Sequence, residues 1–129
     1  MKTLNMLALA AFAGAGIGAL AVERIHAQSA EPPAAYYVVE IDVTNEDIYN
    51  KQWSPKADET IRAAGGVYLV RSANIERIEG AAPKRLLITK WDNLDKLTSW
   101  RESDAYMKTL PLLDKAVRSV RSYAVEGVN

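Results

Sequence analysis

Residues 36–43 read YYVVEIDV, the most regular stretch of a chain of 129 residues. Apolar side chains alternate along it with the others, which predicts a β-strand with one apolar face. That face consists of Tyr37, Val39, Ile41 and Val43. The other face carries the carboxylates of Glu40 and Asp42, so we expect it to be the open, mixed side of a sheet.

The segment after this strand predicts a helix that runs to the two glycines at 65–66. Aromatic and small residues recur there at helical spacing, and Thr44 with Asp47 forms a capping-box pattern at the start. Pro55 removes one backbone donor, so we expect a kink or a new start with Ser54 as the cap. Glycines tolerate positive φ, so the pair would end the helix.

The rest of the chain predicts three further strands, at 67–71, 84–91 and 119–126. Asp92 would cap a second helix, and Ser103 a third that Pro111 breaks in two. The order strand, helix, strand, strand, helix, strand predicts an α+β fold. This is the ferredoxin-like βαββαβ plan, a four-stranded antiparallel sheet with helices on one face. The consecutive apolar residues 86–88 leave the facing of the third strand open.

An apolar run at residues 6–22 follows Lys2 and ends at charged residues. A basic start, an apolar middle and a small-residue exit at Ala27 are typical of a secretory signal. We expect a signal peptide at 1–27, a linker at 28–35 and one domain at 36–129. The mature protein would be periplasmic or secreted, with no stable membrane association. The alternative is an uncleaved N-terminal helix that anchors the chain.

Composition narrows the chemistry of the mature domain. The chain has no cysteine, and its single histidine, His26, lies in the predicted leader. No carboxylate cluster has metal-ligand spacing, and no serine has a histidine to activate it, so we expect neither a metal nor a cofactor. The 16 basic and 16 acidic residues form no basic patch, which disfavours a nucleic-acid partner.

Several stretches, taken in order, resemble the domain-of-unknown-function family numbered 1330. They are YYVVEIDV, GGVYLVR, PKRLLITKWD, the residues Trp100, Ser103 and Tyr106, and a terminal VEG. The similarity covers residues 36–128, and the leader and the ending YAVEGVN resemble the exported branch of the family. The resemblance implies a homodimeric α/β barrel, in which two ferredoxin-like sheets pack face to face. It implies no activity.

The resemblance also implies which arginine positions of the family are kept in this chain and which are not. Arg71 and Arg85 match positions typical of the family. Val67 and Leu113 stand where members often carry arginine, so part of any polar pocket formed by those arginines would be lost in this chain.

Six residues are candidates for ligand binding: Glu40, Arg71, Arg85, Tyr106, Tyr49 and Trp53. Either arginine could bind a carboxylate or phosphate in bidentate fashion, or form a salt bridge to Glu76, Glu79 or Glu102. The aromatic candidates could line a small pocket, or they could fill the core together with Trp100. Tyr106 is the strongest of them, because a buried hydroxyl needs a partner.

Glu40 lies inside an otherwise apolar strand and has two interpretations. It could be a base or a ligand anchor whose pKa is raised by burial. It could equally be a carboxylate on the open face, paired to Lys90, to Arg85 or to a dimer mate.

Two functions remain open, and no catalytic residue is assigned. We favour an exported homodimeric module that binds a small molecule or another protein. The alternative is a cofactor-free enzyme, resembling an isomerase or oxygenase, that acts on a small substrate in the barrel. In that enzyme Glu40, Arg71 and Tyr106 should converge on one enclosed cavity.

Overall fold

The computed structural model describes residues 31–129, of which Pro33–Asn129 form one compact unit. The predicted leader and residues 28–30 of the predicted linker lie outside the described residues. Within residues 31–129, no helix is both long and apolar enough to cross a membrane.

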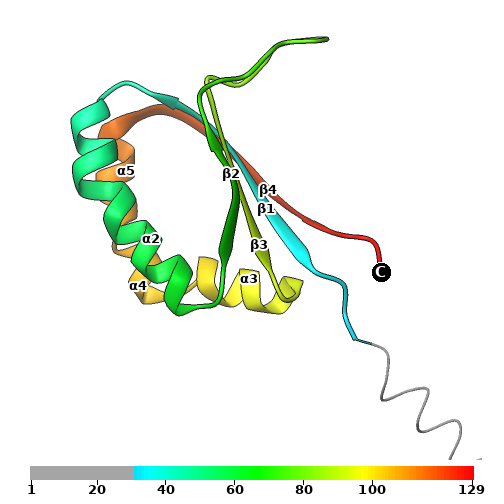
Figure 1. Cartoon of the computed structure of the whole chain (residues 1–129). Coiled ribbons are helices and arrows are strands. Elements are labelled where there is room, and N and C mark those ends of the chain that lie inside the picture. The colour runs from blue at the N-terminus through cyan, green and yellow to red at the C-terminus, as the bar shows by residue number, and fades with distance from the viewer. Residues whose placement is uncertain (1–30) are drawn as a thin grey trace, which may run out of the picture. The chain divides into compact units, whose positions relative to one another are not determined.

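Four strands form one antiparallel sheet in the order β2-β3-β1-β4. They are β1 (Ala35–Val43), β2 (Val67–Ser72), β3 (Arg85–Trp91) and β4 (Val117–Glu126). The helical segments are η1 (Ile48–Trp53), α2 (Ser54–Ala63), α3 (Leu94–Arg101), α4 (Asp104–Met107) and α5 (Leu110–Ala116). All of them lie on one side of the sheet, and the β2–β3 connection projects away from the domain (Figure 1). The predicted α+β, ferredoxin-like architecture is confirmed.

The alternation along β1 decides which face is covered. Tyr37, Val39 and Ile41 are buried in the core, while Glu40 on the opposite face is only partly buried. The sequence did not show which residues of β3 face the core. Leu87 does, since it is 4% exposed, whereas its neighbour Ile88 is only partly buried and faces outward. We call the side toward the helices the inner face and the other the outer face.

Aromatic rings fill the space between the inner face and the helices. The Trp100 ring lies 4.8 Å from that of Trp91 and 4.3 Å from that of Tyr106, measured between centroids. Both indoles are satisfied, since Trp91 Nε1 donates to Thr89 Oγ1 at 2.9 Å and Trp100 Nε1 to Thr60 Oγ1 at 3.0 Å. This packing joins the sheet to α2, α3 and α4.

Gly66 allows Trp91 to close that core. A Cβ at position 66 would lie 2.6 Å from the Trp91 ring and 2.8 Å from Ile61. Gly65 before it has a φ of 92°, a left-handed conformation that favours glycine. The expected helix stop at this pair is therefore confirmed.

Two predicted helix caps are wrong by one residue. The Asn45 side chain, rather than that of Thr44, accepts the Ile48 amide at 3.1 Å, and the Thr44 amide instead donates to the Ala116 carbonyl. The Asn93 side chain, rather than that of Asp92, caps α3 by accepting the Lys96 amide at 2.9 Å. An amide oxygen one residue nearer to the helix reaches the free donors better.

The predictions at the two prolines have different outcomes. Trp53 and Ser54 are both in helical conformation, so η1 runs into α2, and the prediction that Ser54 caps a new helix is wrong, because Ser54 is the first residue of α2. Ser103 caps α4 as expected, accepting the Tyr106 amide at 3.3 Å. The break near Pro111 is also confirmed, because α4 ends at Met107 and Pro111 lies in the first turn of α5.

Candidate functional site

A cavity of about 180 Å³ lies between the inner face of the sheet and the helices. We call it the sheet–helix cavity. Strand residues Val39 and Leu87 and helix residues Trp53 and Leu113 give it apolar walls. Asp114 and Val120, which is 43% exposed, also border it and mark an opening near β4.

Several polar side chains also line this cavity, and one of their groups lacks a partner among residues 31–129. Trp53 lines it and is 4% exposed, yet its buried Nε1–H makes no hydrogen bond within the described part of the chain. Arg101 Nε donates to the Tyr37 hydroxyl at 3.3 Å, and its guanidinium lies 5.0 Å from the centre of the Tyr106 ring. A buried donor without a partner costs about 1–3 kcal/mol, so the Trp53 N–H is suited to a ligand oxygen.

Tyr106 lines the same cavity and is 4% exposed. Burial, with a smaller contribution from Tyr37, raises the pKa of Tyr106 to about 12, and the nearby Arg101 opposes this only in part. The hydroxyl therefore stays protonated at neutral pH and can donate a hydrogen bond into the cavity.

A second pocket, of about 240 Å³, is polar. We call it the arginine pocket. Five of its residues have polar side chains: Tyr49, Asn50, Arg71, Ser72 and Arg85. Three of the six predicted candidates thus meet here, although η1, β2 and β3 are far apart in sequence.

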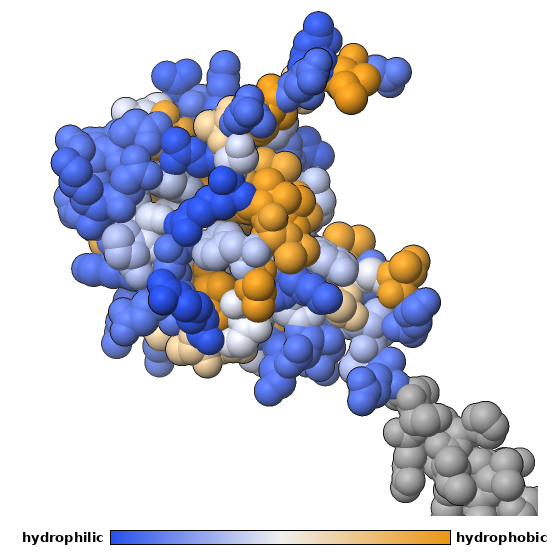
Figure 2. Space-filling view, in the orientation of Figure 1, coloured by the Kyte–Doolittle hydropathy of each residue, from blue (hydrophilic) through white to orange (hydrophobic). Residues whose placement is uncertain are grey.

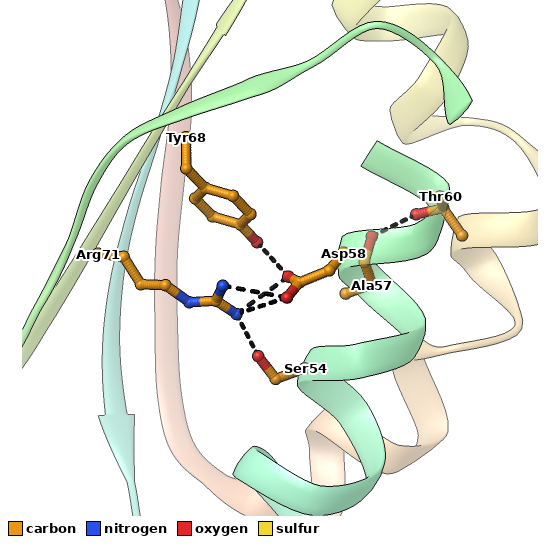
Figure 3. Close-up of polar contacts among 6 residues, drawn as sticks. All are labelled: Ser54, Ala57, Asp58, Thr60, Tyr68 and Arg71. Atoms are coloured by element: carbon orange, nitrogen blue, oxygen red, sulfur yellow. Dashed lines mark hydrogen bonds and ion pairs between the residues drawn. The ribbon is translucent and has the colours of Figure 1, made fainter. Parts of the chain in front are cut away.

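Arg71 is held by α2 rather than by the glutamates considered from the sequence. Its Nη1 and Nη2 each donate to Asp58 at 3.0 Å, and Nη2 also donates to Ser54 Oγ (Figure 3). The Tyr68 hydroxyl donates to the same carboxylate at 2.9 Å, and Arg71 stacks on the Tyr68 ring. Burial and this hydrogen bond raise the pKa of Tyr68. The predicted pairing of Arg71 with Glu76, Glu79 or Glu102 is wrong.

Arg85 is buried more deeply and paired more weakly. Its side chain is 19% exposed, and Nη2 donates to Glu46 at 3.0 Å, but the Glu46 side chain is 59% exposed. The guanidinium also lies 4.6 Å from the centre of the Tyr49 ring. Exposed ion pairs contribute little, so the Glu46 partner is easily exchanged.

Glu40 lies on the outer face, away from both sites. It pairs with Arg121 across the β1–β4 ladder, with 3.6 Å between carboxylate and guanidinium, and not with Lys90 or Arg85. Glu40, Arg71 and Tyr106 border three different pockets. The proton-transfer site that would have required these three together is therefore not formed within one protomer.

Several residues of these sites were not anticipated from the sequence. No sequence motif marked Arg101 or Asp114 as a residue that would line a cavity. Asp58 could have been found, because it follows Ser54 by four residues and such residues share one helix face. Among residues 31–129, no group of three or more histidine, cysteine or acidic side chains is placed to hold a metal ion.

A family model described as Domain of unknown function (DUF1330) matches residues 34–128. The chain belongs to the DUF1330 family. The resemblance seen in the sequence is thereby confirmed for the family. No functionally curated protein matches the chain significantly.

Solved structures similar to this DUF1330 domain share its fold. A protein of unknown function from Rhodopseudomonas palustris matches with a TM-score of 0.65 at 9% identity, covering 82% of this chain and 93% of that one. SnoaB, a cofactor-independent oxygenase from Streptomyces nogalater, matches with a TM-score of 0.53 at 10% identity, covering 75% and 95%. A conserved protein from Methanosarcina mazei Go1 matches with a TM-score of 0.53 at 16% identity, covering 74% and 94%. Identities this low show the fold alone.

The two positions at which the sequence resemblance leads us to expect arginine lie in different environments. Leu113 is 5% exposed and lines the sheet–helix cavity. Val67 is 60% exposed and borders neither the sheet–helix cavity nor the arginine pocket. Of these two positions, only Leu113 therefore contributes an apolar side chain to the cavity of this DUF1330 protein.

Proposed function

We propose that this DUF1330 protein binds one small, flat, mainly apolar molecule in the sheet–helix cavity. The cavity itself carries the proposal. At about 180 Å³ it slightly exceeds the roughly 150 Å³ that suffices for a benzene ring in an apolar site. Its walls are mainly aliphatic and aromatic, and they include Leu113, a position at which the sequence resemblance leads us to expect arginine.

The polar groups define the ligand further. The Trp53 N–H has no partner in the part of the chain that the structure describes, and the Tyr106 hydroxyl stays protonated at neutral pH. Both are donors, so the ligand should carry an oxygen acceptor on one edge of its ring. Phenols and cyclic ketones have this form.

The outer face supports a homodimer as the setting of this site. Val67, Tyr123 and Val125 are 60%, 47% and 50% exposed there, and Val38 and Ile88 lie between them in the sheet. In Figure 2 apolar surface gathers over the strands, whereas the helix side is mainly polar. A second copy would cover this face, as the family resemblance implies. Export to the periplasm or beyond, after cleavage near Ala27, is part of the same proposal.

Thermal melting with phenol and toluene tests ligand binding, because a compound that binds only the folded state raises Tm. We expect both to raise Tm and to quench tryptophan fluorescence, and phenol to do so at lower concentration. Val120→Trp, which fills the opening, should abolish the effect, while Val128→Trp at an exposed position serves as the matched control. Equal shifts in the two variants, or no shift with either compound, would overturn the proposal.

The alternative is a cofactor-free enzyme acting in the same cavity, which the fold similarity to a cofactor-independent oxygenase favours. Asp114 at the opening would accept a proton, and Tyr106 with Arg101 would stabilise negative charge on a substrate oxygen. Oxygen uptake with hydroquinone distinguishes the two functions. Uptake that Asp114→Asn removes would favour the enzyme, and ligand binding without uptake favours the binding protein.

A further inference from the structure

The arginine pocket is a separate feature that the proposed function does not use. Arg71 pairs with Leu87 across the β2–β3 ladder, and Arg85 precedes Leu87 by two residues on β3. Both arginines therefore extend from the inner face of the sheet, near the end at which β3 begins. Tyr49 and Asn50 of η1 close the pocket from the helix side, and Ser72 borders it at the end of β2.

The two arginines differ in how firmly an acidic side chain pairs with them. Asp58, whose side chain is 17% exposed, holds Arg71 through both of its terminal nitrogens. Glu46, which is 59% exposed, meets Arg85 through Nη2 only. An arginine carries five N–H donors. Arg85 thus combines a mostly buried guanidinium with a partner that is largely in solvent.

The contacts of Glu46 indicate that donors of this pocket bind a carboxylate. Its carboxylate accepts from Arg85 Nη2 at 3.0 and 3.2 Å and from Asn50 Nδ2 at 2.9 Å. Arg85 and Asn50 both line the pocket, so an exposed side chain of the protein already occupies donors suited to an oxyanion.

Tyr49 carries a buried hydroxyl close to Arg85. The residue is 2% exposed, and no group among residues 31–129 meets its hydroxyl with full hydrogen-bond geometry; burial raises its pKa, and the nearby Arg85 guanidinium offsets part of that rise. Such an unmet group costs about 1–3 kcal/mol. It lines the same pocket as the two arginines, so one bound oxygen could satisfy it together with Arg85.

We propose that the arginine pocket binds the oxyanion of a small molecule, a carboxylate or a phosphate group. Arg85, Asn50 and the Tyr49 hydroxyl hold the anion, and Arg71 fixed by Asp58 adds positive charge behind it. Glu46 is an internal competitor that occupies Arg85 and Asn50 when no ligand is bound. The site is independent of the sheet–helix cavity and of its ligand.

Calorimetric titration of the full mature protein with inorganic phosphate and with acetate, at constant ionic strength, tests this site. Arg85→Gln should weaken binding at least about tenfold, since it removes a charged hydrogen-bond donor. Glu46→Gln should strengthen binding several-fold, because the competing charge is gone while the shape is kept. Arg118→Gln is the control, since Arg118 is 75% exposed and pairs only loosely with Asp42, at 3.8 Å.

The opposite signs of the two variants separate a built site from weak surface attraction. Equal affinities in wild type, Arg85→Gln and Glu46→Gln would overturn the proposal, as would weaker binding in Glu46→Gln. Should Arg85→Gln fail to fold, Arg85→Lys keeps the charge but loses the planar fork, and it should still bind more weakly than wild type. Phosphate bound more tightly than acetate would assign the ligand to phosphate compounds, and the reverse order to carboxylates.

Discussion

The two faces of the sheet are made by alternate residues of the same strands, yet they differ in exposure and in what covers them. Leu87 on the inner face is 4% exposed and packs into an aromatic core beside the sheet–helix cavity. Ile88, next to it, faces outward among apolar side chains and the Glu40–Arg121 ion pair. The inner face thus provides the packed core and borders the cavity in which we propose a ligand. The outer face retains apolar area that no other part of residues 31–129 covers, which is typical of an interaction surface.

The largest expected effect comes from truncating neighbouring residues on opposite faces. Leu87→Ala should lower the free energy of unfolding by about 2–5 kcal/mol, because it leaves a gap in a packed core. Ile88→Ala should cost less within the protomer, and its cost should depend on protein concentration if the outer face joins two copies. Urea denaturation at two protein concentrations measures both. If both variants lose the same unfolding free energy at both protein concentrations, the inner and outer faces do not differ in how much they stabilise the protein.

Alkaline pH tests the inner face through Tyr106. Its pKa is about 12 in the fold against 10.0 for the free side chain. The folded state therefore keeps a proton that the unfolded chain loses, and stability decreases from pH 10 to pH 12. The difference of two pH units corresponds to about 2–3 kcal/mol.

One variant isolates this contribution from other groups that titrate at the same pH. Tyr106→Phe should flatten the decrease in unfolding free energy between pH 10 and pH 12. An identical pH dependence in wild type and Tyr106→Phe would show that Tyr106 titrates as it does in water.

The fold could be predicted from local patterns because those patterns are governed by burial. The alternation in 36–43 selected the inner residues of β1, and the glycine pair at 65–66 ended α2 where Trp91 needs space. The apolar residues 86–88 gave no alternation, so only tertiary packing could orient β3. The caps moved to Asn45 and Asn93 because an adjacent side chain reached the free amides better.

The sites were less predictable, and β2 shows why. Tyr68 and Arg71 are three residues apart, so regular alternation places them on opposite faces. A register shift between Tyr68 and Val70 adds one residue, and both side chains then reach Asp58. Nothing in the sequence marks this bulge. The arginine pocket, with Arg71, Arg85 and Tyr49, therefore appears only after the strands are paired.

The smallest effect concerns the outer face alone. Val38→Asp places a charge at the centre of the apolar outer face, and burying an unpaired charge between two copies is unfavourable. We expect the dimer to dissociate at protein concentrations at least about tenfold higher, or about 1.4 kcal/mol, with little change in the fold of the protomer. Light scattering across a micromolar dilution series gives the dissociation constant. Circular dichroism verifies that the variant is folded.

A matched variant shows whether this effect belongs to the outer face. Ala105→Asp introduces the same charge at an exposed position in the first turn of α4, where a carboxylate is favoured by the helix dipole. It should leave the dimer intact, because the helices lie on the opposite side of the sheet (Figure 1). If Ala105→Asp separates the copies and Val38→Asp does not, the helices form the contact. If wild type is a monomer throughout, the outer face has some other partner, and its apolar residues need a different explanation.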